Sequence, residues 1–473
     1  MKKYLAAGIL LVLLLLAGFY YLYQRGGNAY RGLVPSDARV VAVLNTKELL
    51  KAADLSLRDI LAILHASADE QTGLRLLSPV YGFVTPREEK GFATAVASKK
   101  KVEKWLTLHG MNVESDKGYQ WASSGDWLLA FDKNRLLAMT SSQGNTHPAL
   151  RELMLSLLSE ESSGNPLVVK AEEQEGILGA ATFLDDAFLR HLGVPRAFIP
   201  ALFEGEEVVQ CASLSMEENV LKLIATVQTD NNSLREVFDA LSEIASPLTD
   251  NLPSFLPEDP AISVRMNLEG ESLLPLLRKN PKLRTALLAL NLVIDADMMI
   301  RSIAGDVQMT IPEYPSEESE WLFTAKLSDT SFLSNLSHWS TGLTSYFVKF
   351  QALSDTDFYI STADLAVYFG VRNDRLYVTP SSTLSGIACV ENPQPDPQYS
   401  IQPESRLYAQ FDVSMLEQLL LSSERFSSAR MPLSSLLSIA DNLTMNVFDG
   451  PRAELQLNCH QPLSEWLKSI VMP

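Results

Sequence analysis

The chain has 473 residues, of which 46% are hydrophobic and 20% are charged. This composition is typical of a folded protein with an ordinary core and excludes a disordered or fibrous chain. The formal net charge of −18 argues against a nucleic-acid partner, because nucleic acid selects basic surfaces. Three cysteines are too few to build a disulfide scaffold.

The strongest local feature is an uncharged, mostly apolar run over residues 5–23. As a helix it would be about 28 Å long, close to the thickness of a bilayer core. Lys2 and Lys3 precede it and favour a cytoplasmic N-terminus. We therefore expect residues 1–25 to form an uncleaved signal anchor that crosses the inner membrane once. The alternative is a cleaved signal peptide, which would leave a soluble periplasmic protein.

A lipid anchor is not expected at this end of the chain. Residues 15–18 resemble the start of a lipoprotein signal, but Phe19 stands where the acylated cysteine would have to be. Residues 26–32 predict a short tether with Gly26 and Gly27. Residues 1–32 carry four basic and no acidic residues, so the part expected in the periplasm has a net charge of −22.

Two segments of this exported part open in the same way. Residues 35–45 and 257–267 each contain Pro-x-Asp, then a β-rich run, then Asn, at an offset of 222 residues. Each pattern predicts a turn and a buried strand. An amphipathic helix is expected after each one, at residues 47–53 and 271–278.

Further elements recur in the same order after these openings. They are a hairpin with a helix (81–108 and 305–343), a second hairpin (126–140 and 364–379), and a closing strand, helix, hairpin and helix (181–244 and 407–471). The order predicts an α+β fold, an internally duplicated body of antiparallel hairpins with helices on one face. We expect related halves at 33–250 and 251–473, because a period of this length indicates domain duplication and not a solenoid.

No pattern in the sequence indicates a catalytic, cofactor-binding or metal-ligating residue. Cys211, Cys389 and Cys459 form no CxxC and are expected to be small buried residues, with one long-range disulfide left open. No two histidines are three or four residues apart, so no zinc site is expected. The sequence contains neither GxSxG nor a Gly-rich phosphate loop.

Three weaker patterns have simple structural explanations. Asp355 and Asp357 could suggest Ca²⁺, but the glycine and distal glutamate of a calcium loop do not follow, which favours solvated acids. The basic run at residues 99–101 predicts an exposed helix start. Trp121 and Trp127 could form a carbohydrate platform, but the break at residues 123–125 favours core packing.

The opening Leu33-Val34-Pro35-Ser36-Asp37-Ala38, the strand ending at Asn45, and residues 47–50 resemble an uncharacterised family of exported proteins common in Bacteroidota. Its members are carried as a domain of unknown function and open with an anchor or lipoprotein signal and a Val-Pro-x-Asp-Ala phrase. The hairpin with Trp127 and Asn134-Arg135-Leu136 fits the same family. The resemblance implies an exported envelope protein but transfers no activity and no functional residue.

We therefore expect a cell-envelope protein anchored through residues 5–23, whose exported body binds an envelope protein or another envelope component without catalysis. Two alternatives stay open. One is an envelope hydrolase whose site is assembled from distant Asp, Glu or Ser residues, which would need a pocket where they converge. The other is a carrier of an apolar ligand, which would need a large apolar cavity between the halves.

Overall fold

The computed structural model describes residues 30–52, 54, 56, 72–75, 77–141, 147–159, 164–184, 208–229, 232–248, 260–279, 281–291, 295–312, 320–335, 349–361, 366–389, 402, 404–415, 417 and 430–466. The chain divides into two compact units. The first is Met1–Thr229 with Gln461–Pro473, and the second is Asp230–His460. The division between the compact units thus precedes the expected break between residues 250 and 251.

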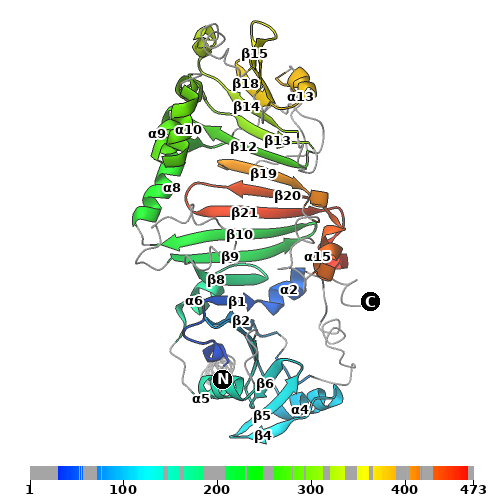
Figure 1. Ribbon diagram of the computed structural model, residues 1–473. Helices are drawn as coiled ribbons and strands as arrows, with labels where there is room; N and C mark the ends of the chain where they lie inside the picture. The colour runs from blue at the N-terminus through cyan, green and yellow to red at the C-terminus, as the bar shows by residue number, and fades with distance from the viewer. Residues whose placement is uncertain are drawn as a thin grey trace, which may run out of the picture. The chain divides into compact units, whose positions relative to one another are not determined.

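The sheet of the first unit is antiparallel, and its strands are not in chain order (Figure 1). Neighbouring strands follow the order β4 (Glu114–Asp116), β5 (Tyr119–Ser124), β6 (Trp127–Phe131), β7 (Arg135–Ser141), β3 (Glu89–Ala95), β2 (Val80–Val84), β1 (Val40–Leu44), β8 (Leu178–Leu184), β9 (Val208–Glu217) and β10 (Val220–Thr229).

Helices cover both faces of this sheet. Helices α5 (His147–Ser159) and α6 (Pro166–Glu172) pack with Val43 and Leu137 in one core cluster. Helix α4 (Lys99–Leu108) packs with Leu136 in another. The expectation of helices on one face was therefore wrong for this unit. Leu136 and Leu137 are adjacent in β7 and face opposite sides, so both faces are apolar and both need cover.

The other helices that the structure describes in the first unit are short. Helix α2 (Thr46–Ala52) follows β1, as predicted for residues 47–53. A 3-10 helix, Arg31–Leu33, precedes β1. Helix α6 begins where Asn165 accepts a hydrogen bond from the Leu167 backbone N–H and Pro166 takes the first helical position, a favourable N-terminal sequence.

The second unit has a sheet with a corresponding strand order. Its neighbours follow the order β15 (Lys349–Ala352), β16 (Asp357–Ser361), β17 (Ala366–Arg372), β18 (Arg375–Thr379), β14 (Leu322–Lys326), β13 (Val307–Ile311), β12 (Ile262–Leu268), β19 (Leu407–Asp412), β20 (Ala440–Val447) and β21 (Arg452–Cys459). A short strand, β11 (Ala245–Ser246), also pairs with β12.

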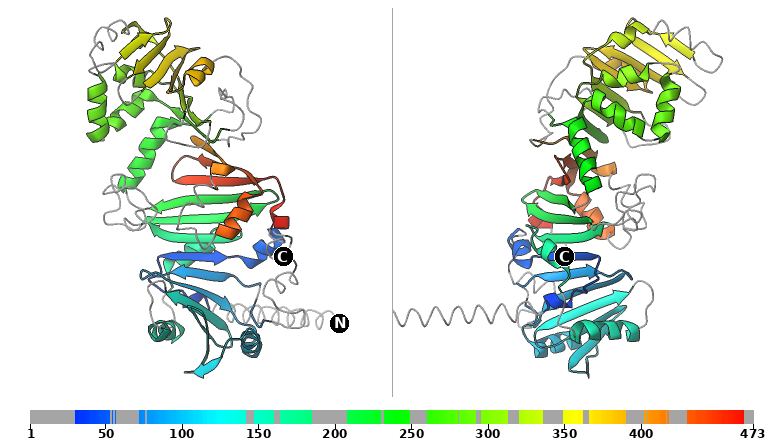
Figure 2. Two further views of the ribbon diagram at one scale, coloured as in Figure 1. Left: turned by 45° about the vertical axis from the view of Figure 1, so that its right-hand side comes forward. Right: turned by 90° about the vertical axis from the view of Figure 1, so that its left-hand side faces the viewer.

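The helices of the second unit are α8 (Asn232–Ile244), α9 (Gly270–Lys279), α10 (Pro281–Asn291), α11 (Ala296–Arg301), α13 (Ser382–Ile387) and α15 (Arg430–Leu437). Figure 2 shows α9 and α10 lying side by side, and Leu274 of α9 and Leu287 of α10 share a core cluster with Ala296 of α11. A larger cluster joins Phe358, Phe369 and Leu376 of the outer hairpins.

The described residues thus form an α+β fold built mostly of antiparallel strands. The predicted hairpins at 126–140 and 364–379 are confirmed as β6–β7 and β17–β18. Asn373 and Asp374 take positive φ values of 51° and 56° at the second tip, as a two-residue hairpin turn requires. At the other tip Asp132 accepts hydrogen bonds from the backbone N–H groups of Asn134 and Arg135.

Parts of the predicted organisation lie outside the described residues. The helix expected at 331–343 is a 3-10 helix over Ser331–Asn335, and its continuation is not among them. The signal anchor at residues 5–23 and most of the tether also lie outside them. Within the described ranges, no helix is both long and apolar enough to cross a membrane.

Candidate functional site

One face of the second sheet is polar where the corresponding face of the first sheet is apolar. In the first sheet Val43 pairs with Tyr81 of β2 on one side and Gly179 of β8 on the other. In the second sheet Arg265 holds the matching place, between Gln308 of β13 and Tyr408 of β19. Because directly paired residues share a face, the comparison extends to the neighbouring strands, where Ser213 of β9 holds the place of Asn446 of β20.

We define the polar face by its buried members. They are Ser263, Arg265, Gln308, Thr310, Thr324, Tyr377, Thr379, Tyr408, Gln410, Thr444, Asn446 and Glu454, and none is more than 9% exposed. One row of direct partners runs through Glu454, Asn446, Tyr408, Arg265, Gln308, Thr324 and Tyr377. The other members lie two residues away along the same strands and therefore point to the same side.

Some of these groups bond to one another. The Gln308 amide donates to Thr310 Oγ1 at 3.2 Å, and the Tyr408 hydroxyl donates to Gln410 Oε1 at 3.1 Å. The Gln456 amide donates to Glu454 Oε1 at 2.6 Å. These bonds satisfy part of the buried polar surface, as burial requires.

Three other groups of the polar face are left without a partner. Ser263 Oγ, Thr324 Oγ1 and Asn446 Oδ1 have no hydrogen bond to any residue that the structure describes. Each side chain is buried, with a relative exposure of 2% or less. An unsatisfied buried polar atom costs roughly 1–3 kcal/mol of stability.

The helix packing that closes this face in the first unit cannot be repeated in the second. A Cβ atom at Gly179 would lie 2.1 Å from the Ala171 carbonyl oxygen, so α6 lies directly on a glycine there. The matching residue in the second sheet is Tyr408, which is buried and carries a large side chain where the first sheet has a glycine.

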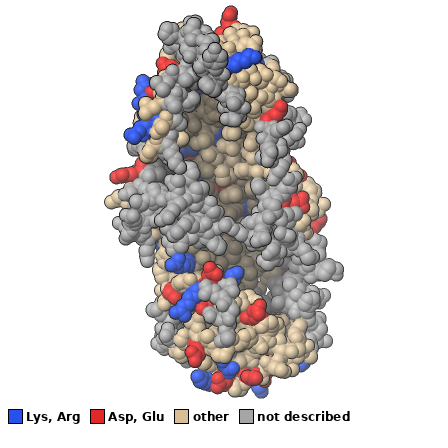
Figure 3. All heavy atoms as spheres, in the orientation of Figure 1, with Lys and Arg blue, Asp and Glu red and all other residues tan. Residues whose placement is uncertain are grey.

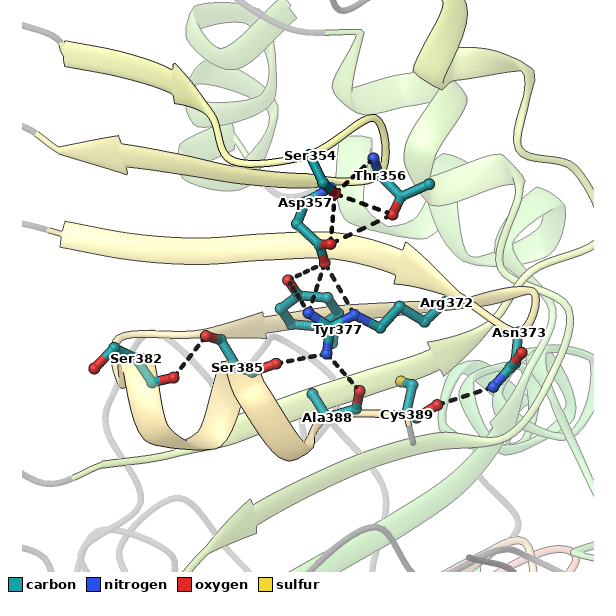
Figure 4. A network of polar contacts seen from close by, with 10 residues as sticks. All are labelled: Ser354, Thr356, Asp357, Arg372, Asn373, Tyr377, Ser382, Ser385, Ala388 and Cys389. Carbon is teal, nitrogen blue, oxygen red and sulfur yellow. Dashed lines mark hydrogen bonds and ion pairs between the residues drawn. The ribbon is translucent and has the colours of Figure 1, made fainter. Parts of the chain in front are cut away.

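The row ends in a network centred on Asp357 of β16 (Figure 4). The Tyr377 hydroxyl donates to Asp357 Oδ1 at 2.6 Å, across the intervening strand β17. Gly370 of β17 lies between them, and a Cβ there would be 2.7 Å from Tyr377 Cε1 and 2.9 Å from Asp357 Oδ1. The glycine thus leaves the space in which this bond forms.

Arg372 joins the same network to helix α13. Its guanidinium lies 2.8 Å from Asp357 Oδ1 and donates to the carbonyl oxygens of Ser385 and Ala388 at 2.7 and 3.0 Å (Figure 4). Every group around Asp357 therefore has a partner, and the network positions α13 over β17 and β18.

Burial alone would raise the pKa of Asp357, but hydrogen bonds from Ser354 and Tyr377 and the charge of Arg372 outweigh it and hold that pKa below its ordinary value. Burial, and then the bond to Asp357, raise the pKa of Tyr377. The pair is thus an ionised carboxylate and a neutral phenol at neutral pH. The expectation that Asp355 and Asp357 are both solvated acids was wrong for Asp357, because Arg372 lies beside it.

The three cysteines are free and buried, as expected. Burial raises the pKa of the Cys389 and Cys459 thiols to about 11 and also raises the pKa of Cys211. All three thiols are therefore protonated at neutral pH and poorly nucleophilic.

The two tryptophans do not form a platform. Trp121 is buried in the first core cluster, whereas Trp127 is half-exposed on the other face and lies 5.6 Å from Phe92 between ring centroids. The turn at Gly125 separates them onto two strands, β5 and β6. Core packing is thus confirmed for Trp121 and was wrong for Trp127, which is exposed. The lysines at 99–101 begin helix α4 as predicted.

The first unit has a hollow of about 490 Å³ whose lining includes Glu114, Trp121, Ser123, His147 and Arg151. The Arg151 guanidinium lies 4.5 Å from the Trp121 ring centroid and pairs with Asp116 at 3.1 Å. No hydrogen bond links Ser123, Glu114 and His147 in the described part of the chain. The described residues also contain no group of three His, Cys, Asp or Glu that could hold a metal.

Charge on the visible surface is mixed. Among the described residues on the face that Figure 3 shows, basic and acidic side chains are interspersed. This face therefore presents no extended basic surface of the kind that binds phosphate backbones.

Sequence reasoning missed both the polar face and the Asp357 network. Strand β12 alternates Ile262, Ser263, Val264, Arg265 and Met266, which is a clear signal that the polar residues share one face. Alternation of this kind ordinarily indicates a solvated face. Burial of the face depends on distant segments, which no local pattern reveals.

These features define a two-unit α+β protein with a buried polar sheet face in its second unit. The family model described as "Domain of unknown function (DUF4836)" matches residues 67–386, which is more than half of the chain. The protein therefore belongs to this family. The expected membership of an uncharacterised domain family is confirmed at that level.

The solved structures give only distant similarity. Crystal forms IV, I and III of TP0453 are 13%, 15% and 14% identical to this chain, each with a TM-score of 0.29. They cover 45%, 45% and 46% of this chain and 84%, 83% and 88% of TP0453. A TM-score this low supports no argument about function. No curated protein matches the chain.

Proposed function

We propose that the protein is a membrane-anchored component of a bacterial cell envelope, with a non-catalytic binding body exported to the periplasm. The anchor is the apolar run at residues 5–23, and the lysines before it support an exported C-terminal body. The phrase Val34-Pro35-Ser36-Asp37-Ala38 supports an origin in Bacteroidota. The net charge of −22 beyond residue 32 suits a soluble body that anionic lipid repels.

Domain duplication is part of this proposal. The two sheets have the same strand order, and Val43 and Arg265, at the offset of 222 residues, hold the same place in the two registers. A duplicated pair lets one copy keep an apolar core while the other changes its chemistry. The first unit is then the structural copy, and the second is the binding copy.

The observation that carries the proposal is the polar face. Ser263, Thr310 and Gln308 stand where Val41, Phe83 and Tyr81 stand in the first sheet. Exchange of apolar core residues for buried polar ones costs stability unless the polar groups are bonded. A binding function explains why such residues occupy the interior of this unit. It also disfavours an apolar ligand, because the buried groups are amides, hydroxyls and charges.

The experiment is crosslinking of the full chain in its own envelope, followed by identification of what is attached. Three chains are compared: wild type, Gln410→Leu on the polar face, and Thr94→Val in the sheet of the first unit as a control. We expect one consistent adduct with wild type and the control, and its loss with Gln410→Leu. Equal recovery from all three chains, or turnover by the purified protein in a broad hydrolase screen, would contradict the proposal.

A further inference from the structure

Resting on the proposed binding function, we propose that the polar face binds an elongated, neutral, hydroxyl-rich ligand, namely an oligosaccharide chain. The argument starts from Asn446 Oδ1, Thr324 Oγ1 and Ser263 Oγ, which lack hydrogen-bond partners among the described residues. Asn446 Oδ1 can only accept a hydrogen bond, so its partner must be a donor. A ligand hydroxyl supplies that donor, and hydroxyls can both donate to and accept from Thr324 and Ser263.

Charge favours a neutral ligand over an anion. The row holds one cation, Arg265, and one anion, Glu454. Arg452 lies 3.6 Å from Glu454, and Arg372 neutralises Asp357 at the far end of the row. An anion placed along the row would meet the Glu454 carboxylate, and it would offer no donor to Asn446.

The spacing of the groups favours an extended molecule. Thr324 and Asn446 are separated by four strand intervals, through β13, β12 and β19, which amounts to about 19 Å at 4.8 Å for each interval. A small ligand cannot reach both groups. A linear chain that crosses the strands can satisfy them in turn.

The composition of the row favours a glycan over an extended peptide. A peptide bound to a sheet is recognised through pockets for alternate side chains. Between Thr324 and Asn446 the row presents Gln308, Arg265 and Tyr408, which are amide, guanidinium and phenol groups. These groups suit repeated hydroxyls, and the row contains no aliphatic side chain for an apolar pocket.

Binding is tested by calorimetry on the full chain in a sugar-free detergent. The probes are maltohexaose, cellohexaose, chitohexaose and soluble peptidoglycan fragments, with inorganic phosphate and polyglutamate as anionic controls. We expect one of the glycans to bind, at least tenfold weaker binding to Thr324→Val and to Asn446→Leu, and unchanged binding to Thr94→Val. Absence of glycan binding, binding of the anions alone, or equal loss in the Thr94→Val control would overturn the inference.

A second readout separates a binding role from a structural one. If the Thr324 hydroxyl has no partner in the free protein, its replacement by an isosteric methyl removes a desolvation cost. Thr324→Val should then unfold about 2–4 °C higher than wild type without ligand, while binding the glycan more weakly. A lower unfolding temperature would show that the hydroxyl is bonded within the fold and would overturn the inference.

Failure of this inference and failure of the proposed function give different results. If no glycan binds, but crosslinking still recovers a partner that Gln410→Leu loses, the polar face binds something else. That result would contradict the oligosaccharide proposal but not the proposed binding function. If crosslinking recovers nothing that depends on Gln410, both the binding function and the oligosaccharide proposal are contradicted.

Discussion

Arg265 stands in the second sheet where Val43 stands in the first, although the two strands have matching neighbours. Val43 lies between Tyr81 and Gly179, and Arg265 lies between Gln308 and Tyr408. One register thus carries an apolar core in one unit and a buried polar face in the other. This contrast separates the strand order, which both units share, from the side-chain chemistry of this face, which differs between them in the described residues.

Substitution of Gly370 by alanine tests the network at the end of the polar face. The new Cβ would lie 2.5 Å from the Thr356 carbonyl oxygen, 2.7 Å from Tyr377 and 2.9 Å from Asp357. We expect a loss of about 1–3 kcal/mol in the free energy of unfolding, the usual cost of overpacking. The measurement is urea denaturation.

The matched control is Gly386→Ala in helix α13, where a Cβ would meet nothing within 4 Å. Alanine at this position should leave the free energy of unfolding unchanged or raise it by up to about 1 kcal/mol, because alanine is a better helix former than glycine. Equal destabilisation by the two changes would contradict the account of Gly370.

The Asp357 carboxylate should make the stability of the second unit depend on pH. Its pKa is lowered in the folded state, so its stabilisation is present above the unfolded pKa of about 3.9 and is lost as pH falls through the folded value. Asp357→Asn should cost about 1–3 kcal/mol at pH 7, because it breaks charge-assisted hydrogen bonds. Urea titrations between pH 7 and pH 3 should show the difference from wild type shrinking. A difference that stays constant over this range would count against the assigned role.

The thiols should be inert in the folded protein. Burial raises the pKa of Cys389 and Cys459 to about 11 and also raises that of Cys211. A thiol reagent at pH 8 should therefore react slowly with the native chain and rapidly with all three cysteines in urea, where the ordinary pKa of about 8.5 returns. Fast labelling of the native protein would show that a cysteine is exposed or activated.

The N-terminal segment should remain on the mature protein. The run at residues 5–23 ends in the aromatic residues Phe19, Tyr20 and Tyr21, which suit a membrane interface better than a cleavage site. The intact mass of protein purified from membranes should include residues 5–23, and alkaline carbonate should not release it. A mature chain that begins after residue 23 would identify a cleaved signal peptide instead.

Much of the fold could be predicted from local patterns. The turn residues Asn373 and Asp374, flanked by apolar alternation, locate a hairpin correctly because positive φ and strand period are local properties. The sequence did not predict helices on both faces of the first sheet. Leu136 and Leu137 point to opposite faces of β7, and they indicate two apolar faces only if β7 lies between two other strands, which the sequence does not reveal. The polar face was missed because alternation in β12 looks the same whether Arg265 meets water or the protein interior.

The most direct test of the central claim is native mass spectrometry of the full chain purified from its own cells. If the polar face is a binding surface, the wild-type chain should carry a bound mass that is absent from Thr324→Val and present on Thr94→Val. A glycan would appear as a ladder of sugar-unit increments. The absence of a bound mass from all three chains would contradict the claim.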